Sequence, residues 1–299
     1  MTLLFSGASG FLGMHILSIL QKNYEVTTIG LTPQDHIRTN LSKDILNLTG
    51  TFDIILHAAG KAHSVPKTEA ERQVFFDVNL QGTKNLCNAL EKSGIPKAFI
   101  FISTVAVYGC TSGEAIKETH PLEGTSPYAL SKKMAEEFLM EWCSKYGVEL
   151  SILRPSLIAG PNPPGNLGSM INGIKTGRYL SIAGGKAKKS VLMVQDIATL
   201  VPILVEKGGG IYNVCDSHHP SFSELEELIC WQLNKARPLV VPYWLAKCMA
   251  MVGDCLGSKS PINTDKLYKI TAPLTFSNEK IIRELDWTPT NVLDHFTID

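Results

Sequence analysis

A tyrosine and a lysine, both side chains that can handle protons, stand four residues apart in the stretch SPYALSKK, residues 126–133. Positions i and i+4 share one face of a helix, so Tyr128 and Lys132 would lie side by side. Ser126 and Pro127 fit an N-cap and the first helical position, which predicts that a helix begins here. The spacing alone does not separate a catalytic pair from two residues that a helix brings together, so the rest of the chain must decide.

Three glycines near the N-terminus, Gly7, Gly10 and Gly13, form the pattern G-x-x-G-x-x-G. They lie between an apolar run, TLLFS, and a segment with helical periodicity, GMHILSILQKN. Glycine lets the backbone turn sharply and bring its N–H groups close to a pyrophosphate, and the helix N-terminus adds partial positive charge. At the start of a chain in which strands and helices alternate, this pattern predicts a dinucleotide-binding loop.

Apolar strands alternate with helical segments through the first half of the chain. The predicted strands contain TLLFS, YEVTTIG, FDIILH, KAFIFIST and ELSILRP. Continuously apolar strands indicate a parallel sheet that is covered on both faces. We therefore predict an α/β protein with a Rossmann-type doubly wound parallel sheet in residues 1–160. Shorter elements and connections rich in glycine and proline predict a smaller substrate-binding region in residues 161–299, with residues 190–215 packing back on the first domain.

Composition argues against several classes of protein. The 299 residues include 28 basic and 28 acidic side chains, so no excess of charge favours a nucleic-acid partner. The N-terminus lacks the basic region of a secretory signal, and no uncharged apolar run reaches the roughly 18 residues of a membrane span. The closest candidate, residues 241–257, contains Lys247 and Asp254, and we expect a partly buried helix there.

Seven cysteines are an odd number and include no C-x-x-C pair. Together with the missing signal sequence, they predict reduced thiols in a cytoplasmic protein. Their spacing matches no zinc or iron–sulfur pattern, so we expect no metal site. The lack of an apolar run long enough to span a membrane predicts no membrane partner.

Further motifs follow one another in an order that resembles a known family. They are HAAG at 57–60, VNLQGTKNL at 78–86, STVAVYG at 103–109, YALSK at 128–132 and LRP at 153–155. With the glycine loop, they make the chain resemble the extended short-chain dehydrogenase/reductases, and within these the NAD-dependent epimerases, dehydratases and reductases of nucleotide sugars. The resemblance covers essentially the whole chain. It implies NAD(P)(H) as the cofactor and a UDP-linked sugar as the substrate.

The resemblance identifies Tyr128 as the catalytic acid/base and Lys132 as its partner. Thr104 would be the hydroxyl beside them, with Ser103 as the neighbouring alternative. A phenol titrates near pH 10 in model peptides, so a base at neutral pH needs a stabilised phenolate. Lys132 and the positive nicotinamide of an oxidised cofactor would supply that stabilisation, at about 1.4 kcal/mol for each unit by which the pKa falls.

The resemblance also implies contacts with the cofactor. The glycine loop and the backbone N–H groups after it would bind the pyrophosphate, the segment after the fourth strand would let the cofactor pass closely, and further residues would flank the adenine and the nicotinamide. The expected cofactor-binding residues are Gly7, Gly10, Phe11, Leu12, Gly13, Gly30, Asn40, Leu41, Ala58, Ala59, Gly60 and Pro155.

Gly30 bears on the choice between NAD and NADP. The end of the second strand usually carries an acid that binds the ribose 2′-hydroxyl of NAD, or has a base nearby for the 2′-phosphate of NADP. Gly30 offers no carboxylate, and no arginine directly follows it. The choice stays open, with a slight preference for NADP(H) because no acid repels the phosphate.

The sequence also narrows the reaction. Dehydratases of this branch carry an Asp-Glu pair directly after the active-site threonine, whereas this chain has Val105 and Ala106, so a 4,6-dehydratase is not expected. Lys189 replaces the arginine that binds diphosphate in the family, and the R-P-G-D segment of many epimerases is absent. We therefore expect hydride transfer at C4 of a UDP-linked hexose or aminohexose, first as a 4-keto-6-deoxy-hexosamine reductase. The alternative is a UDP-hexose 4-epimerase with tightly bound NAD.

Four further residues are candidates for contacts with the sugar or the nucleotide: Lys61, His63, Asn166 and Lys189. By analogy with similar proteins, helices within residues 75–92 and 128–146 would pair across the two-fold axis of a homodimer.

A different class of function is a non-catalytic NADP(H)-sensing or scaffold protein. Relatives of that kind commonly lose the tyrosine or the lysine. Because Tyr128 and Lys132 are both present, the sequence favours an enzyme.

Overall fold

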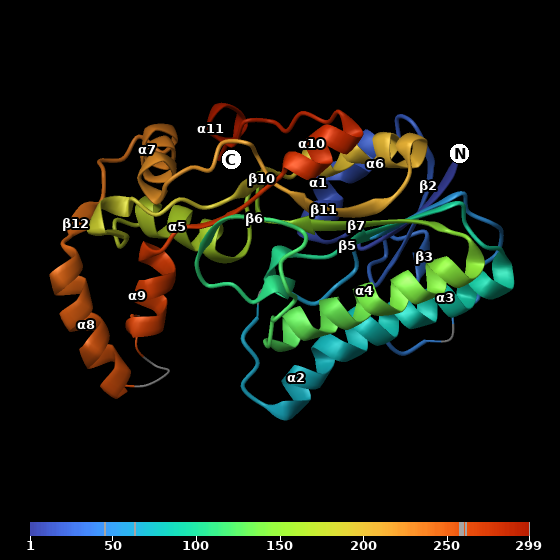
Figure 1. Ribbon diagram of the computed structural model, residues 1–299, viewed down its shortest axis with the longest axis horizontal. Coiled ribbons are helices and arrows are strands. Elements are labelled where there is room, and N and C mark those ends of the chain that lie inside the picture. Colours follow the sequence, from blue (N-terminus) through green and yellow to red (C-terminus); the bar gives the residue numbers. More distant parts are fainter. Residues whose placement is uncertain (45, 63, 257–259, 261, 299) are drawn as a thin grey trace.

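The computed structural model describes residues 1–299 except 45, 63, 257–259, 261 and 299. Its centre is a seven-stranded sheet in the order β11-β7-β5-β4-β1-β2-β3, in which every pairing is parallel (Figure 1). The strands are β1 (Thr2–Ser6), β2 (Glu25–Gly30), β3 (Ile37–Arg38), β4 (Ile54–His57), β5 (Ala98–Ile102), β7 (Glu149–Pro155) and β11 (Gly210–Val214). The order reverses beside β1, and ligands of such sheets bind at the carboxyl ends of the strands near that reversal. The predicted doubly wound Rossmann-type fold is confirmed.

Helices cover both faces of the sheet, since both faces of its strands are apolar. In β1, Leu3 and Phe5 belong to the core on one face, and Leu4 belongs to the core on the other. The first face is covered by α1 (Phe11–Leu20), α6 (Asp196–Lys207) and α10 (Glu279–Leu285), and the second by α3 (Gly82–Ser93) and α4 (Pro127–Tyr146) (Figure 1). Burial on both sides explains why the strands read as continuously apolar.

The remaining elements of the first half connect these layers. They are α2 (Glu69–Phe76), the π-helical turn η1 (Asp77–Gln81), the 3₁₀ turn η2 (Val105–Tyr108) and β6 (Gly113–Ile116). The turn η1 joins α2 to α3 without a break. Helix α4 begins at Pro127, with the Ser126 side chain accepting the Ala129 N–H at 3.1 Å, as the sequence predicts.

The second half of the chain adds a core of its own. Its strands form three two-stranded pairings: β8 (Leu157–Ala159) with β10 (Val191–Met193), β9 (Leu180–Ile182) with β12 (Leu239–Val241), and β13 (Leu274–Phe276) with β6 of the first half. Helices α5 (Gly165–Lys175), α7 (Phe222–Gln232) and α11 (Val292–His295) enclose apolar residues that belong to neither face of the main sheet. Meanwhile α6, β11 and α10 pack into the main sheet's core, and the division into domains 1–160 and 161–299 stays a prediction.

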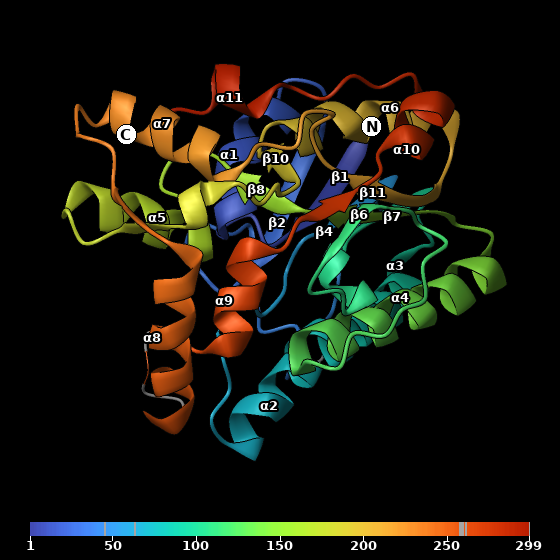
Figure 2. The same cartoon turned by 60° about the vertical axis from the view of Figure 1, so that its left-hand side comes forward.

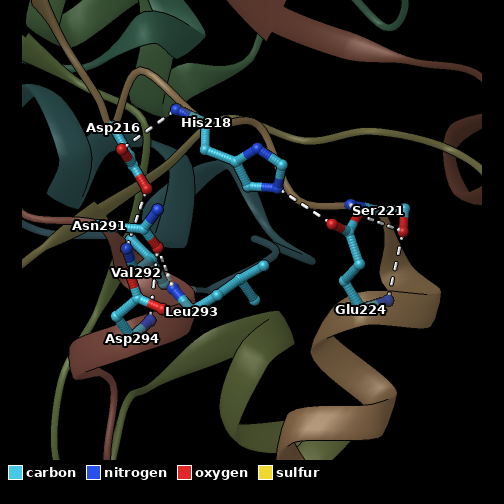
Figure 3. Close-up of polar contacts among 8 residues, drawn as sticks. All are labelled: Asp216, His218, Ser221, Glu224, Asn291, Val292, Leu293 and Asp294. Atoms are coloured by element: carbon cyan, nitrogen blue, oxygen red, sulfur yellow. Dashed lines mark hydrogen bonds and ion pairs between the residues drawn. The ribbon is translucent and has the colours of Figure 1, made fainter.

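Polar caps fix the ends of α7 and α11 (Figure 3). The Ser221 hydroxyl accepts the Glu224 N–H at 3.2 Å, and the Glu224 carboxylate accepts the Ser221 N–H at 2.8 Å, which is a capping box. Asp216 accepts the N–H groups of His218 at 3.1 Å and of Val292 at 2.9 Å. Asp216 therefore ties the segment after β11 to the start of α11.

Helix α8 (Tyr243–Leu256) and helix α9 (Thr264–Thr271) pack against each other and project from the body (Figures 1 and 2). The partly buried helix that the sequence predicts is α8, in which a narrow stripe that includes Ala246 and Ala250 is buried against Leu267 of α9. Trp244 is 67% exposed and Val252 is 62% exposed. The fold therefore leaves these two apolar side chains of α8 on the surface. Across the described residues, no helix is both long and apolar enough to cross a membrane.

Candidate functional site

Tyr128 and Thr104 meet at the carboxyl edge of the sheet. Tyr128 lies in the first turn of α4, where the hydroxyl of Thr104, which follows β5, is near enough to lower the pKa of the phenol. Thr104 is held as the N-cap of η2, because its hydroxyl accepts the Ala106 N–H at 3.1 Å. The ring of Tyr128 tilts against buried Phe75 at 6.4 Å between centroids. The structure thus brings together the phenol and one of its two candidate hydroxyl partners.

Ser103, the other candidate hydroxyl, is buried and hydrogen-bonded within the core. It donates a hydrogen bond to Glu136 of α4. Glu136 also forms an ion pair with Arg154 of β7 at 2.6 Å, and these two side chains are 0% and 3% exposed. Arg154 further donates to the Tyr108 hydroxyl at 3.0 Å. Thr104 rather than Ser103 is therefore the hydroxyl that affects Tyr128, while Ser103 belongs to a buried network that the sequence did not predict.

Lys132 lies one helical turn beyond Tyr128 and is only 4% exposed. Its ammonium donates to the Ile102 carbonyl at 2.8 Å and lies 4.5 Å from the centroid of the Phe101 ring. Burial lowers the pKa of Lys132 to about 8, although the charge of Glu136 acts in the opposite direction. At neutral pH the side chain is therefore an ammonium at the carboxyl end of β5.

Asn79 clamps the loop after β4 beside this ammonium. Its Oδ1 accepts the Lys61 N–H at 2.7 Å, and its Nδ2 donates to the Lys61 carbonyl at 3.2 Å and to the Ser131 hydroxyl at 2.8 Å. A Cβ placed on Gly60 would lie 3.1 Å from Asn79 Oδ1 and 3.2 Å from Lys132 Nζ. The π-helical turn that carries Asn79 therefore holds the loop close to the helix that carries Tyr128 and Lys132.

The protonation of Tyr128 follows from its surroundings. Burial raises the pKa of the phenol, and the hydrogen bond with Thr104 offsets that rise in part. The chain's own residues thus keep Tyr128 protonated at neutral pH. A protonated phenol beside a second hydroxyl can donate its proton to a carbonyl oxygen that is being reduced.

The glycine loop forms a cradle that fits a dinucleotide. Gly7 has φ +85°, and a Cβ there would come within 2.6 Å of the Ala59 nitrogen. A Cβ on Gly13 would come within 2.4 Å of Ala8 Cα. Gly7 is therefore required for the close approach of the β1–α1 turn to the loop after β4, and Gly13 for the close packing of α1 on that turn. The N-terminus of α1 begins beside this turn, and exposed backbone N–H groups at such an end suit a pyrophosphate.

His57, the last residue of β4, connects β1 and α3 through hydrogen bonds of its buried imidazole. Its Nδ1 shares a hydrogen bond with the Ser6 hydroxyl at 2.5 Å, and its Nε2 shares one with the Thr83 hydroxyl at 2.9 Å. The Ser6 hydroxyl also accepts the Ala59 N–H at 3.3 Å. Complete burial, reinforced by the charge of Lys132, lowers the pKa of His57 to about 3, so the imidazole is neutral. The HAAG motif contained this residue, but its positioning role emerges only in three dimensions.

The other expected cofactor residues also border this edge. Phe11 and Leu12 open α1, Ala58 and Gly60 flank Ala59 after β4, Gly30 ends β2, and Pro155 ends β7. The next residue, Ser156, has a buried hydroxyl with no hydrogen-bond partner among the described residues, which is suited to a ligand's amide. The residues expected near the adenine, Asn40 and Leu41, follow β3; Asn40 Oδ1 accepts from Ser42, and Leu41 is buried.

The candidate substrate residues are more dispersed. Lys61 and Asn166 are exposed, in the loop after β4 and in the first turn of α5, and His63 lies outside the described residues. The ammonium of Lys189 donates to the carbonyls of Lys269 and Ala272 at 2.9 Å each, so it caps the end of α9. The ammonium also lies 5.9 Å from the centroid of the Phe222 ring in α7, and among the described residues no hydrogen bond or ion pair joins it to Tyr128 or Lys132. Among the described ranges, no cluster of three or more His, Cys, Asp or Glu side chains could hold a metal ion.

Comparisons with known proteins agree with this geometry. The model of the "NAD dependent epimerase/dehydratase family" matches residues 3–215. The N-acetyl-alpha-D-glucosaminyl-diphospho-ditrans,octacis-undecaprenol 4-epimerase of Escherichia coli O157:H7 is 29% identical, over 93% of this chain and 88% of that protein. The GDP-6-deoxy-D-mannose reductase of Pseudomonas aeruginosa is 29% identical, over 76% of this chain and 78% of that protein. A structure of UDP-glucose 4-epimerase from Thermotoga maritima with UDP-glucose shares the fold, with a TM-score of 0.75, 19% identity and coverage of 98% of this chain and 96% of that chain.

Proposed function

We propose a hydride-transfer function on the premise that this chain belongs to the NAD-dependent epimerase/dehydratase family, whose model matches residues 3–215. It is an enzyme of the nucleotide-sugar epimerase and reductase group. We infer that the reaction occurs at C4 of a sugar carried on a diphosphate, with NAD(P)(H) bound in the β1–α1 cradle. The observation that carries the proposal is the placement of Tyr128 in the first turn of α4 beside the Thr104 hydroxyl, which lowers the pKa of the phenol, and one turn from buried, charged Lys132.

Each of the three side chains has a role in proton transfer. In the reducing direction, Tyr128 donates its proton to the C4 keto oxygen while Thr104 hydrogen-bonds the same oxygen. The Lys132 ammonium then stabilises the phenolate that remains, and oxidation follows the reverse path. The bound nicotinamide supplies or accepts the hydride. A positioned proton donor of this kind contributes roughly a hundred- to ten-thousand-fold in rate.

Within this chemistry we favour a 4-keto reductase that acts on a UDP-linked 4-keto-6-deoxy-hexosamine. Burial keeps Tyr128 protonated, which suits a proton donor, and the ammonium of Lys189 is occupied by backbone carbonyls instead of being free for the diphosphate grip expected of an epimerase. The second candidate is a 4-epimerase with tightly bound NAD, supported by the E. coli relative's activity. A non-catalytic NADP(H) sensor is the third, and the assembled Tyr128, Lys132 and Thr104 argue against it.

The carrier of the sugar has a second candidate of its own, a polyprenol. The E. coli relative acts on a sugar diphosphate linked to undecaprenol. In this chain, α8 exposes Trp244, Met251 and Val252 to between 57% and 67%. Aromatic and aliphatic side chains on a projecting helix suit the interface of a membrane that contains such a lipid. The diphosphate is common to both carriers, so the catalytic roles do not change.

A single assay separates these candidates. The protein is incubated with UDP-4-keto-6-deoxy-N-acetylhexosamine, with UDP-hexoses or with polyprenyl diphosphate N-acetylglucosamine, and nicotinamide absorbance is followed beside product stereochemistry. Stoichiometric loss of reduced cofactor supports a reductase, and interconversion without net loss supports an epimerase.

We expect Tyr128→Phe to lower turnover by roughly a hundred- to ten-thousand-fold while dinucleotide binding is retained. Tyr24→Phe, outside the site, is the matched control, and equal turnover in both variants would contradict the assigned role.

We also propose a homodimer formed through α3 and α4. The support is the analogy with similar proteins together with the outward faces of these helices, where Met134 and Met140 of α4 are 41% and 39% exposed.

A further inference from the structure

Asp35 folds back onto Gly30 at the end of β2. A Cβ placed on Gly30 would lie 2.6 Å from Asp35 Oδ2 and 3.0 Å from Asp35 Oδ1. The carboxylate thus fills the space into which a side chain at position 30 would project. In dinucleotide-binding folds, that position carries the acid that hydrogen-bonds the ribose 2′-hydroxyl.

The carboxylate is held in place by its own loop. Thr32 donates to Asp35 Oδ2 from its N–H at 2.9 Å and from its hydroxyl at 2.8 Å, and the Asp35 N–H donates back to the Thr32 carbonyl at 3.1 Å. The next residue, His36, anchors the loop to Thr28 through its N–H at 3.0 Å. Asp35 is 8% exposed. Because both bonds from Thr32 end on Oδ2, Oδ1 is the oxygen that can accept a bond from a ribose hydroxyl.

We propose that Asp35 replaces the ribose-binding acid that Gly30 lacks and selects NAD(H) over NADP(H). This inference rests on the proposed function, since it requires a dinucleotide in the β1–α1 cradle. The 2′-hydroxyl of NAD donates to the carboxylate, whereas the 2′-phosphate of NADP places negative charge against it at close range. The slight preference for NADP(H) drawn from the sequence rested on the absence of an acid at position 30, and Asp35 removes that basis.

Arg38 is the feature that opposes this assignment. It pairs with Gly30 in the register of β2 and β3, so its guanidinium can reach a 2′-phosphate. Its side chain is exposed, however, and ordering a long exposed side chain costs conformational entropy. The carboxylate of Asp35 is already fixed by two hydrogen bonds from Thr32. Its repulsion of a 2′-phosphate therefore outweighs the attraction that Arg38 offers.

The test is direct binding of the full chain to NADH and to NADPH, measured by isothermal titration without any sugar substrate. We expect the wild type to bind NADH about tenfold or more tightly than NADPH. Asp35→Asn, which removes the charge, brings the ratio of the two dissociation constants close to one. Glu25→Gln, which removes an exposed acid at the other end of β2, leaves the ratio unchanged. Thr32→Val retains the charge but loses a bond that holds it, and weakens NADH binding selectively even if Asp35→Asn fails to fold.

Three results would overturn the inference. Tighter binding of NADPH by the wild type would do so, and so would an unchanged ratio in a folded Asp35→Asn variant. If the ratio of the two dissociation constants changes in Arg38→Gln and not in Asp35→Asn, then Arg38 and not Asp35 selects the dinucleotide. Binding of neither dinucleotide by folded wild-type protein would overturn the proposed function as well, so that failure is distinguishable from the failure of Asp35 alone.

Discussion

At the scale of single residues, Lys132 holds a charge in a place that disfavours charge. The Ile102 carbonyl and the face of Phe101 solvate the ammonium in part, and Glu136 attracts it from the same helix. Burial still prevails, and the pKa falls from its ordinary 10.5 to about 8. The site thus has an ammonium at neutral pH that is lost more readily than one on the surface.

This lowered pKa predicts how Lys132 affects stability. Because the unfolded chain holds the proton up to about pH 10.5 and the folded chain only to about pH 8, the unfolded state binds more protons between these values. The stability that Lys132 contributes is therefore fully present above about pH 10.5 and is lost as the pH falls through about 8. We expect the free energy of unfolding of the wild type, minus that of Lys132→Met, to rise between pH 7.5 and 9.5 in urea titrations. Lys92→Met, at an exposed site, controls for the loss of a lysine, and a difference that falls with pH would contradict the prediction.

Asp35 and His57 acquire their candidate roles from residues that are close in space but not adjacent in the sequence. Asp35 acquires a candidate role because a glycine at position 30 leaves room for its carboxylate. His57 acquires one because Ser6 and Thr83 both reach its ring. Neither relation follows from residue type, since the partners stand 5 to 51 positions away along the chain.

At the scale of elements, helix ends decide where the reactive groups lie. Ser126 and Pro127 start α4, which places Tyr128 in its first turn near the carboxyl ends of the strands. The turn η1 lies within a continuous helical segment and not at a helix end, and its π-helical hydrogen bonding changes the regular α-helical pattern between α2 and α3. Such turns occur frequently at functional sites, and this one presents Asn79 to Lys61 and Ser131.

The capping box of α7 gives a prediction at this scale. Ser221→Ala removes the hydroxyl that accepts the Glu224 N–H, and we expect it to lower the free energy of unfolding by about 0.5–2 kcal/mol. Ser144→Ala, at an exposed position within α4, is the matched control and should leave stability unchanged or slightly raised. Chemical denaturation with a constant m-value measures both. Equal effects of the two substitutions would show that the contacts in Figure 3 do not stabilise α7.

At the scale of the whole molecule, two surfaces remain that a second copy could cover. One is the outer face of α3 and α4, which the family resemblance favours. The other is α8, whose exposed side chains are more apolar. If the homodimer forms through α3 and α4, then α8 stays free to contact a membrane that contains a polyprenol carrier. If it forms through α8, that surface is covered.

Matched substitutions distinguish these surfaces. We expect the wild type to have twice the 32.7 kDa mass of the chain in light scattering after size-exclusion chromatography. Met140→Arg on α4 should yield a monomer, because it introduces a charge into the proposed interface. Met251→Arg on α8 should remain a dimer. The reverse pattern would move the interface to α8, and a monomeric wild type would contradict the proposed assembly.

The sequence by itself determined the doubly wound fold and identified the segments from which the candidate site is built. Strand and helix periodicity are local, and the glycine loop and Tyr-x-x-x-Lys spacing report the local geometry that their chemistry requires. Contacts between distant segments are not encoded in any one pattern. The engagement of Ser103 by Glu136, the use of Lys189 to cap α9 and the exposure of α8 were therefore decided only by the tertiary structure. The same holds for Asp35, because a carboxylate becomes a candidate ribose contact only when the chain folds it into the space that a glycine leaves open.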